Sequence, residues 1–258
     1  MVSTVIITLN EEKNIRECLE SVKWSDEILI VDSGSSDNTI SICKEYTDKI
    51  YFKEWSGYSL QKNFGIEKVK CDWVLSLDAD ERVTEELKNE INEVTARNEF
   101  DGYYIPRKAF FLGKWIKHSG WYPDYQLRLF RKGKGKFNGR DVHEAIILEH
   151  GDSLQSLKVG YLKNDLLHYP YGDLNHYFEK FNEYTTLSSV ELSKKGKSFC
   201  FCSLIIKPAL FFVKSYFLKL GFLDGWQGFA ICVISSFNTL VKYAKLREIK
   251  RSKKLTSG

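Results

Sequence analysis

The chain has 258 residues, of which 43% are hydrophobic and 28% are charged. These proportions exclude a disordered chain, and the length allows a large core in one domain with an appendage or in two small domains. The net charge of +4 is modest, and basic residues gather from Lys242 onward around a single acid, Glu248. Such a basic tail is typical of segments that bind anionic lipid or nucleic acid, and the alternative is an ordinary solvated terminus. We expect lipid and no nucleic acid.

Cysteine usage and the first residues bear on the cellular compartment. The six cysteines show no Cys-x-x-Cys pair and no histidine partner at zinc spacing, so we expect reduced thiols. Val2–Thr8 is rich in β-branched residues and follows no basic leader or cleavage site. These observations favour a cytoplasmic protein.

The N-terminal half alternates predicted strands with predicted helices. The expected strands are Val2–Thr8, Glu27–Val31, Ile50–Phe52 and Trp73–Leu77. One helix is expected to begin after Asn10, a second to end near Tyr46, and a third to cover Leu60–Val69. This alternation predicts an α/β fold with a mostly parallel sheet, right-handed crossovers and flanking helices.

Polar residues follow three of these strands, at the edge where open α/β sheets bind ligands. They are Asn10 to Glu12, Asp32 to Asp37, and Asp78-Ala79-Asp80-Glu81. Two acids at a buried strand end repel each other unless a cation lies between them, and carboxylates at this spacing suit Mg²⁺ or Mn²⁺ holding a diphosphate. The alternative is a solvated acidic turn before a helix that starts at Thr84.

Taken in order, these segments resemble the signatures of the family 2 glycosyltransferases, which have the GT-A (Rossmann-like) fold. Four later segments resemble the branch of that family that adds sugars to the lipopolysaccharide inner core. They are 121–124 with 128–130, 142–144, and 221–225. The resemblance implies a GT-A nucleotide-sugar-binding and catalytic domain over residues 1–170 and a helical region over residues 171–258.

The resemblance also implies roles for individual residues. Thr8, Asn10 and Glu12 match the segment that cradles the nucleotide, and Asp32 matches the acid that binds uracil. Asn10 is alternatively a helix cap, and Asp32 a turn former. The remaining implied contacts are Lys62 with the diphosphate, Asp78 with ribose or sugar, and Asp80, Asp78 and His168 with the metal. An exposed helical lysine and a buried structural histidine are the alternatives for Lys62 and His168.

The catalytic base is expected about sixty residues beyond the metal motif, where this chain departs from the Glu-Asp pair typical of the family. Glu144 is the first candidate, Asp141 the second and Asp124 the third. A carboxylate near the bound donor can take the proton of an acceptor hydroxyl as the new bond forms. A structural pairing of His143 with Glu144 is the alternative.

From Phe199 the chain becomes apolar and aromatic, with lysines interspersed. Neither apolar stretch, 199–213 or 225–241, contains the roughly 20 strongly apolar residues of a spanning helix. We expect helices lying in the plane of the cytoplasmic face of the membrane, with anionic lipid as partner. The alternative is a helical subdomain packed on the sheet.

The predicted activity is metal-dependent, inverting transfer of a hexose, glucose by the branch resemblance, from a UDP-sugar to a lipid-linked saccharide of the lipopolysaccharide core. The alternatives are transfer to another polyprenyl- or lipid-linked glycan, and a non-catalytic membrane-bound nucleotide-sugar sensor. A nucleotidyltransferase fits less well because no Gly-rich loop follows the first strand. A haloacid-type phosphatase also fits less well, because its aspartate pair usually follows the first strand and here the pair follows the fourth strand.

Overall fold

The computed structural model describes residues 1–258 except 140–144, 149–156, 172, 198 and 257–258, and except the side chains of residues 176 and 253–256. The chain forms two compact units. The first consists of residues 1–108 and 124–170, and the second of residues 109–123 and 171–258. The second unit therefore takes in an excursion, residues 109–123, from the middle of the sequence.

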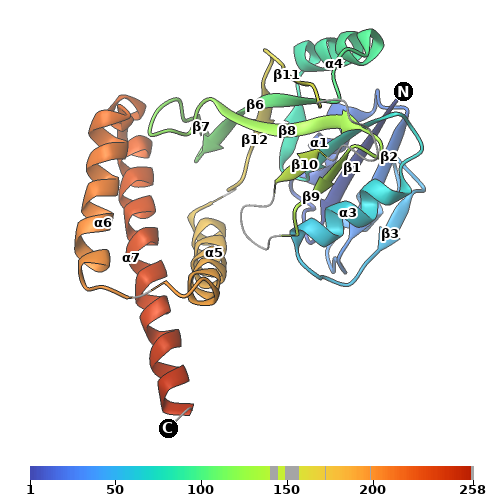
Figure 1. The fold of residues 1–258 in the computed structure, drawn as a ribbon. Helices are drawn as coiled ribbons and strands as arrows, with labels where there is room; N and C mark the ends of the chain where they lie inside the picture. The colour runs from blue at the N-terminus through green and yellow to red at the C-terminus, as the bar shows by residue number, and fades with distance from the viewer. Residues whose placement is uncertain (140–144, 149–156, 172, 198, 257–258) are drawn as a thin grey trace. The chain divides into compact units, whose positions relative to one another are not determined.

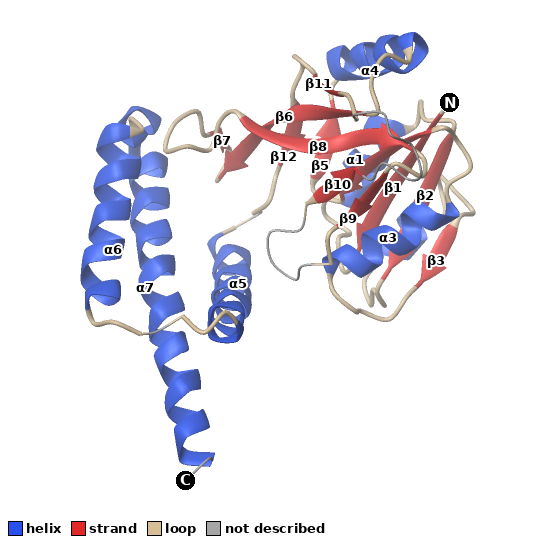
Figure 2. Cartoon of the chain, in the orientation of Figure 1, coloured by secondary structure: helices blue, strands red, loops and turns tan. Residues whose placement is uncertain are grey.

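The first unit carries nearly all of the strands (Figure 2). Its strands are β1 (Val2–Thr8), β2 (Glu27–Asp32), β3 (Ile50–Phe52), β4 (Trp73–Asp78), β5 (Glu81–Val83), β6 (Gly102–Phe111), β8 (Asp124–Arg131), β9 (Gly135–Phe137), β10 (Ile146–Leu148), β11 (Val159–Tyr161) and β12 (Leu166–His168). Its helices are α1 (Ile15–Val22), α2 (Thr39–Cys43), α3 (Tyr58–Lys68) and α4 (Glu85–Arg97). The predicted strands and helices of the first eighty residues are all present.

The main sheet has the order β3-β2-β1-β4-β8-β6-β12-β5. The pairs β3–β2, β2–β1 and β1–β4 are parallel, whereas β8 runs antiparallel to both β4 and β6. The carboxyl ends of β1, β2 and β4 therefore lie along one edge, where the sequence predicts the ligand. The expected α/β class is confirmed.

Helices cover both faces of this sheet because successive strand residues point to opposite sides (Figure 1). On one face Ile28, Ile30 and Leu75 pack with residues of α1, α2 and α4, including Cys18 and Leu87. On the other face Val5, Leu29 and Val74 pack with Ile66 of α3. The close approach of α3 requires Gly65, where a Cβ would lie 2.5 Å from Val5 Cγ1.

The first helix begins later than the sequence predicts. It starts at Ile15, with Asn14 at the N-cap position, so the expectation of a helix capped by Asn10 is wrong. Asn10 has a left-handed backbone, with φ of 55°. The amide N–H groups of Asn14 and Ile15 donate instead to the carbonyl oxygen of Glu11. The residues after β1 therefore form a turn that stays at the sheet edge.

The second unit is helical apart from the end of β6 and β7 (Lys114–Trp115). Its helices are α5 (Leu174–Lys194), α6 (Cys202–Val213), a π-helical turn (Lys214–Leu218), a 3₁₀ turn (Gly221–Asp224) and α7 (Gly225–Thr256). Phe111 and Ile116 of the excursion form a buried cluster with Tyr177 of α5 and Ile231 of α7.

Asp224, the last residue of the 3₁₀ turn before α7, fixes the excursion residues within this second unit. Its buried carboxylate accepts hydrogen bonds from the backbone N–H of Lys117 at 3.3 Å and of His118 at 2.8 Å. Its carbonyl oxygen accepts from Lys114 Nζ at 2.6 Å. The segment 221–225 therefore has a structural role here: it holds residues 114–118 against the helices.

Candidate active site

The loops after β1 and β2 are tied to each other at the carboxyl edge of the sheet. The Asn10 N–H donates to Ser35 Oγ at 2.9 Å, and the Ser36 N–H donates to Asn10 Oδ1 at 2.8 Å. The Asn38 N–H donates to Glu12 Oε2 at 3.0 Å. Asn10 and Glu12 thus lie where the nucleotide is expected, and they also hold the two loops in register.

Asp32 ends β2 and organises the turn that follows it. Its carboxylate accepts from the N–H groups of Gly34 at 2.8 Å and Ser35 at 2.9 Å, and from Ser35 Oγ at 2.5 Å. Gly34 has φ of 102°, which favours glycine. Three of about four acceptor positions of the carboxylate are used by described residues. Asp32 is thus a turn former whose carboxylate can accept a further hydrogen bond. Thr8, at the end of β1, is buried and pairs with Asp32 in the parallel register of β1 and β2.

Residues 61–63 of α3 all contact other elements of the first unit. Gln61 Nε2 donates to the carbonyl oxygens of Lys53 and Glu54. Asn63 exchanges two hydrogen bonds with the backbone of Phe137. Lys62 is only 2% exposed, and its Nζ lies 2.7 Å from Asp78 Oδ1. An exposed helical lysine is therefore the wrong alternative for Lys62.

Six charged side chains of alternating sign run from α3 through β4, β5, β8 and β6. Arg128 Nη2 contacts Asp78 Oδ2 at 2.6 Å and Glu81 Oε1 at 2.7 Å. Arg107 contacts Glu81 Oε1 at 3.1 Å and Asp124 Oδ2 at 2.6 Å. We call this series the charge chain, and its members in order are Lys62, Asp78, Arg128, Glu81, Arg107 and Asp124.

Two central members of the charge chain, Asp78 and Arg128, have pKa values shifted toward their charged forms although both lie in the interior of the first unit. Burial alone would raise the pKa of Asp78, but the Arg128 and Lys62 cations outweigh it and hold that pKa well below its usual range. Burial opposes the charged form of Arg128, but Asp78 and Glu81 raise the pKa of its guanidinium. The repulsion expected between the acids at the end of β4 is thus already relieved at Asp78 by protein cations.

Asp80 lies in the turn between β4 and β5 and faces β12 instead of the charge chain. Its Oδ1 is 3.5 Å from His168 Nε2, and its carbonyl oxygen accepts from the Tyr169 N–H at 2.9 Å. The buried Nδ1 of His168 has no hydrogen-bond partner among the described residues. The structure thus brings together Asp80 and His168, two predicted metal ligands that are 88 positions apart in sequence.

A family model described as "Glycosyl transferase family 2" matches residues 3–150, which is more than half of the chain. The chain belongs to glycosyltransferase family 2. The family resemblance inferred from the motifs is confirmed, and with it the expected GT-A-like α/β architecture. The chain is accordingly a glycosyltransferase.

Similar proteins extend the match beyond this family segment. The lipopolysaccharide core biosynthesis glycosyltransferase LpsC of Rhizobium meliloti is 31% identical over 95% of this chain and 91% of its own length. The uncharacterized glycosyltransferase RT0209 of Rickettsia typhi is 31% identical over 96% and 87%. Among solved structures, Staphylococcus aureus TarS 1–349 with UDP-GlcNAc is 16% identical, covers 99% and 92% of the two chains, and has a TM-score of 0.49.

The three candidates for the catalytic base of this glycosyltransferase differ in what the structure says of them. Glu144 and Asp141 lie outside the described residues. Asp124 opens β8, where Oδ2 accepts from Arg107 and Oδ1 accepts from Gln126 Nε2 at 2.7 Å. Both oxygens of Asp124 are therefore already engaged by neighbouring side chains.

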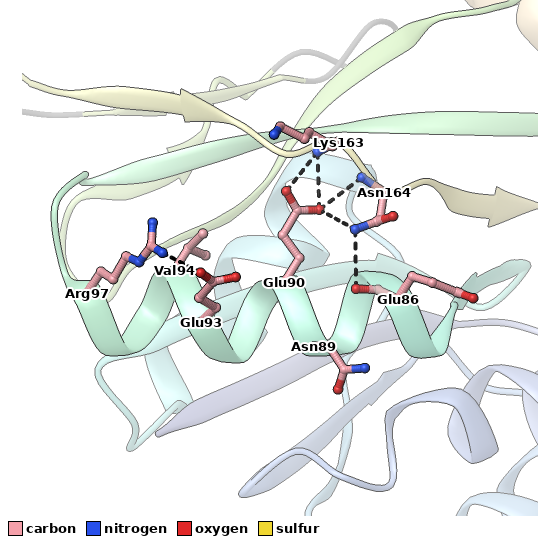
Figure 3. Close-up of a pocket in the computed structure, with 8 residues that line it drawn as sticks. All are labelled: Glu86, Asn89, Glu90, Glu93, Val94, Arg97, Lys163 and Asn164. Atoms are coloured by element: carbon pink, nitrogen blue, oxygen red, sulfur yellow. Dashed lines mark hydrogen bonds and ion pairs between the residues drawn. The ribbon is translucent and has the colours of Figure 1, made fainter.

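A pocket beside α4 contains none of the candidate site residues (Figure 3). There the Glu90 carboxylate accepts from the backbone N–H groups of Lys163 and Asn164 and from Asn164 Nδ2. These bonds fix the loop before β12 to α4. We assign the pocket a structural role, because its acid is used in holding that loop.

Sequence reasoning did not single out Arg107, Arg128 or Glu81 as site residues. Their signal is the alternation of polar residues on one face of β8, namely Asp124, Gln126 and Arg128 at spacing two. A central strand with three polar residues on one face needs partners for them. Here Arg107 pairs with Asp124, Glu81 pairs with Arg128, and Gln126 donates to Asp124.

Proposed function

We propose that this chain is an inverting glycosyltransferase of lipopolysaccharide core biosynthesis, which moves a hexose, glucose in the first instance, from a UDP-sugar to a lipid-linked saccharide. The observation that carries the proposal is the similarity to LpsC over 95% of the chain, combined with three polar loops at one edge of the sheet. The loops after β1 and β2 supply oxygen acceptors for the nucleoside, and the turn after β4 supplies a carboxylate for the diphosphate end.

The donor would lie with its base near Asp32 and its ribose near Thr8, Asn10 and Glu12. Asp32 keeps acceptor capacity for an N–H such as that of uracil N3. Lys62 is buried and paired with Asp78, so in this proposal it supports the diphosphate site by holding Asp78 at the end of β4 and does not present an exposed ammonium group.

Asp80 and His168 fit a divalent cation of the Mg²⁺ or Mn²⁺ type. Among the described residues no three His, Cys, Asp or Glu side chains gather as a complete metal cage. Two protein ligands are enough for Mg²⁺, which is usually bound by one or two protein side chains together with substrate phosphates and water. A carboxylate with an imidazole, whose Nε2 lies 3.5 Å from that carboxylate, is also a suitable donor set for Mn²⁺. When bound, the cation would act as a Lewis acid on the departing diphosphate.

In the proposed reaction the acceptor hydroxyl oxygen bonds to the anomeric carbon as the bond from that carbon to the UDP oxygen breaks. The hydroxyl proton passes to a carboxylate, which we assign to Glu144 or else Asp141, since Asp124 is held by Arg107 and Gln126. The protein forms no covalent bond to the sugar, and UDP leaves with the electron pair of the broken bond.

A screen of UDP-sugars with and without Mn²⁺ tests the proposed function. Thermal shift would report donor binding, and release of UDP in the presence of core oligosaccharide lipid would report transfer. We expect UDP-glucose to stabilise the chain only with Mn²⁺ and to be turned over with that acceptor. Binding without turnover of any donor would favour a nucleotide-sugar sensor, and no binding of any UDP-sugar would overturn the proposal.

We further propose that the second unit attaches the enzyme to the cytoplasmic face of the membrane. Ile206, Leu210 and Val213 recur along α6, and are 50%, 62% and 47% exposed. Because these residues are spaced four and three positions apart, they lie on one face of α6. An exposed apolar face of this kind suits contact with the apolar part of a membrane. The other large apolar side chains between residues 201 and 237 that are at least 40% exposed are Phe201, Ile205, Phe211, Phe217, Leu218, Leu220, Phe222, Leu223, Trp226, Phe229, Val233 and Phe237.

The mode of attachment has two forms that differ at α7. We expected no segment long enough to cross a bilayer, but the helical stretch Gly221–Ser252 is long and apolar enough by length and composition alone. The reason is that the helical stretch is longer than the predicted segment 225–241, since it begins at Gly221 and continues past Val241. We propose the in-plane form, because α6 and α7 lie side by side and both carry exposed aromatic residues (Figure 1).

Replacing Leu210 and Trp226 together by glutamate should weaken binding to vesicles that contain anionic lipid by at least about 100-fold, because two apolar anchors of about 1.5–3 kcal/mol each are lost. The matched control is Phe52→Glu with Leu60→Glu, two exposed apolar residues of the first unit. Equal sedimentation of both double variants with vesicles would contradict the assigned face. Alkaline carbonate should release the wild-type chain from membranes, and retention would favour a spanning α7.

A further inference from the structure

The turn that carries Asp80 is closed by the side chain of Glu81. Glu81 is fully buried, and its Oε2 accepts a hydrogen bond from the Asp78 N–H at 2.9 Å. This bond spans residues 78–81 and therefore fixes the backbone on both sides of Asp80. The other oxygen, Oε1, lies 2.7 Å from Arg128 Nη2 and 3.1 Å from Arg107 Nη1. The orientation of Glu81 is thus set by two arginines from neighbouring strands.

The same turn is held from its opposite side by β12. Glu81 pairs with His168 in the antiparallel register of β5 and β12. The Tyr169 N–H donates to the Asp80 carbonyl oxygen, and Arg82 Nη1 donates to the same oxygen at 3.2 Å. Asp80 therefore lies between two anchors, the strand that carries His168 and the charge chain.

The charge chain contains three cations and three anions, so its charges balance. Arg128 Nη2 bridges Asp78 Oδ2 and Glu81 Oε1, two acids that would otherwise repel each other across the turn. Asp80, the remaining acid of this turn, lies outside the charge chain, with its Oδ1 3.5 Å from His168 Nε2. Buried charges are costly unless each keeps its partner, so loss of one arginine or acid must rearrange the others.

We propose that Glu81 and Arg128 are positioning residues, which hold the 78–81 turn so that Asp80 and His168 meet a metal–diphosphate group in a fixed geometry. This inference rests on the proposed function, because it assigns the support of that same site. Residues that orient metal ligands through hydrogen bonds commonly alter metal affinity by about 10- to 100-fold when replaced. We expect Glu81 and Arg128 to act in this range.

The test measures UDP binding by calorimetry as a function of Mn²⁺ concentration, which does not depend on turnover. Glu81→Gln keeps the size of the side chain and an acceptor for the Asp78 N–H, but loses the charge between Arg128 and Arg107. We expect it to need about tenfold more Mn²⁺ for half-maximal UDP binding. Arg128→Met should need still more, and Arg128→Lys, which keeps the cation, should recover part of the loss.

Glu27→Gln is the matched control, since Glu27 is also a buried acid, 5% exposed, whose Oε1 contacts Lys49 Nζ at 2.5 Å in the same unit. It should lower the melting temperature without changing the Mn²⁺ requirement. If folded Glu81→Gln shows the wild-type Mn²⁺ requirement, the positioning role is overturned. If Glu81→Gln does not fold, Arg128→Lys decides by the same measurement.

Failure of the proposed function gives a different result. In that case wild-type protein itself would bind no UDP at any Mn²⁺ concentration, whatever the variants do. A positioning failure leaves wild-type binding intact and makes the variants equal to it. In kinetics at a fixed, subsaturating Mn²⁺ concentration, positioning predicts that the KM for donor rises more than kcat falls, whereas general loss of folded protein lowers kcat alone.

Discussion

Asp80→Ala is expected to abolish metal-dependent UDP binding and to lower transfer by at least about 10³-fold, because the metal site supplies several kcal/mol of charge stabilisation to the leaving diphosphate. Asp80 is the acid of the β4–β5 turn that faces His168, and Asp78 is already paired with Lys62 and Arg128. Titration of the variant with UDP in the presence and absence of Mn²⁺ is the direct measurement.

The control for this variant comes from the same strand. Asp72 precedes β4 at the opposite end of the strand and is exposed, so Asp72→Ala changes the same residue type away from the carboxyl edge. It should bind UDP with unchanged metal dependence. Wild-type UDP affinity and transfer in Asp80→Ala would remove Asp80 from the site, and equal losses in both variants would point to a general effect on folding.

The parallel part of the fold could be predicted from sequence because its signals are local. Val2–Thr8 and Ile50–Phe52 have the predicted bounds, and Trp73–Asp78 extends the prediction by one residue. Runs of β-branched residues between turn residues specify such strands without knowledge of their partners. Because parallel strands run in the same direction, their carboxyl ends lie at one edge of the sheet. The polar loops that follow them could therefore be predicted to lie together.

The antiparallel half could not be predicted in the same way. The pairing of β4 with β8 joins residues more than fifty positions apart, and β5 pairs with β12 across about eighty. Such pairings depend on which strand edge is free once the rest of the sheet has formed. The excursion 109–123 illustrates the same point, because its place in the second unit follows from Asp224 and the Phe111 cluster, which lie far away in sequence.

The site shows what residue types alone can and cannot specify. Asp78 and Asp80 were expected to share a cation because two acids at a strand end repel each other. In the structure Lys62 and Arg128 neutralise Asp78, while Asp80 turns toward His168. The two acids therefore face different partners, a division that their spacing of two does not encode. It depends on Arg128, whose partners are on other strands.

Glu144→Gln is expected to leave UDP binding unchanged and to lower transfer by about 10²–10⁴-fold, the usual contribution of a general base. Glutamine keeps the size of the side chain but cannot take the acceptor proton. The measurement pairs calorimetric UDP affinity with the rate of sugar transfer at saturating donor. The uncoupling of binding from transfer separates a base from a ligand of the nucleotide or metal, for which both quantities fall together.

Asp141→Asn and Asp124→Asn complete the comparison and locate the base by its effect on transfer alone. Normal transfer in Glu144→Gln together with loss in Asp141→Asn would move the role by three residues. Asp124→Asn should behave differently from either, because Asp124 joins the charge chain through Arg107 and accepts from Gln126. Its loss would uncouple Arg107 from one of its two acids, so we expect a raised Mn²⁺ requirement, as in Glu81→Gln, instead of a selective loss of transfer.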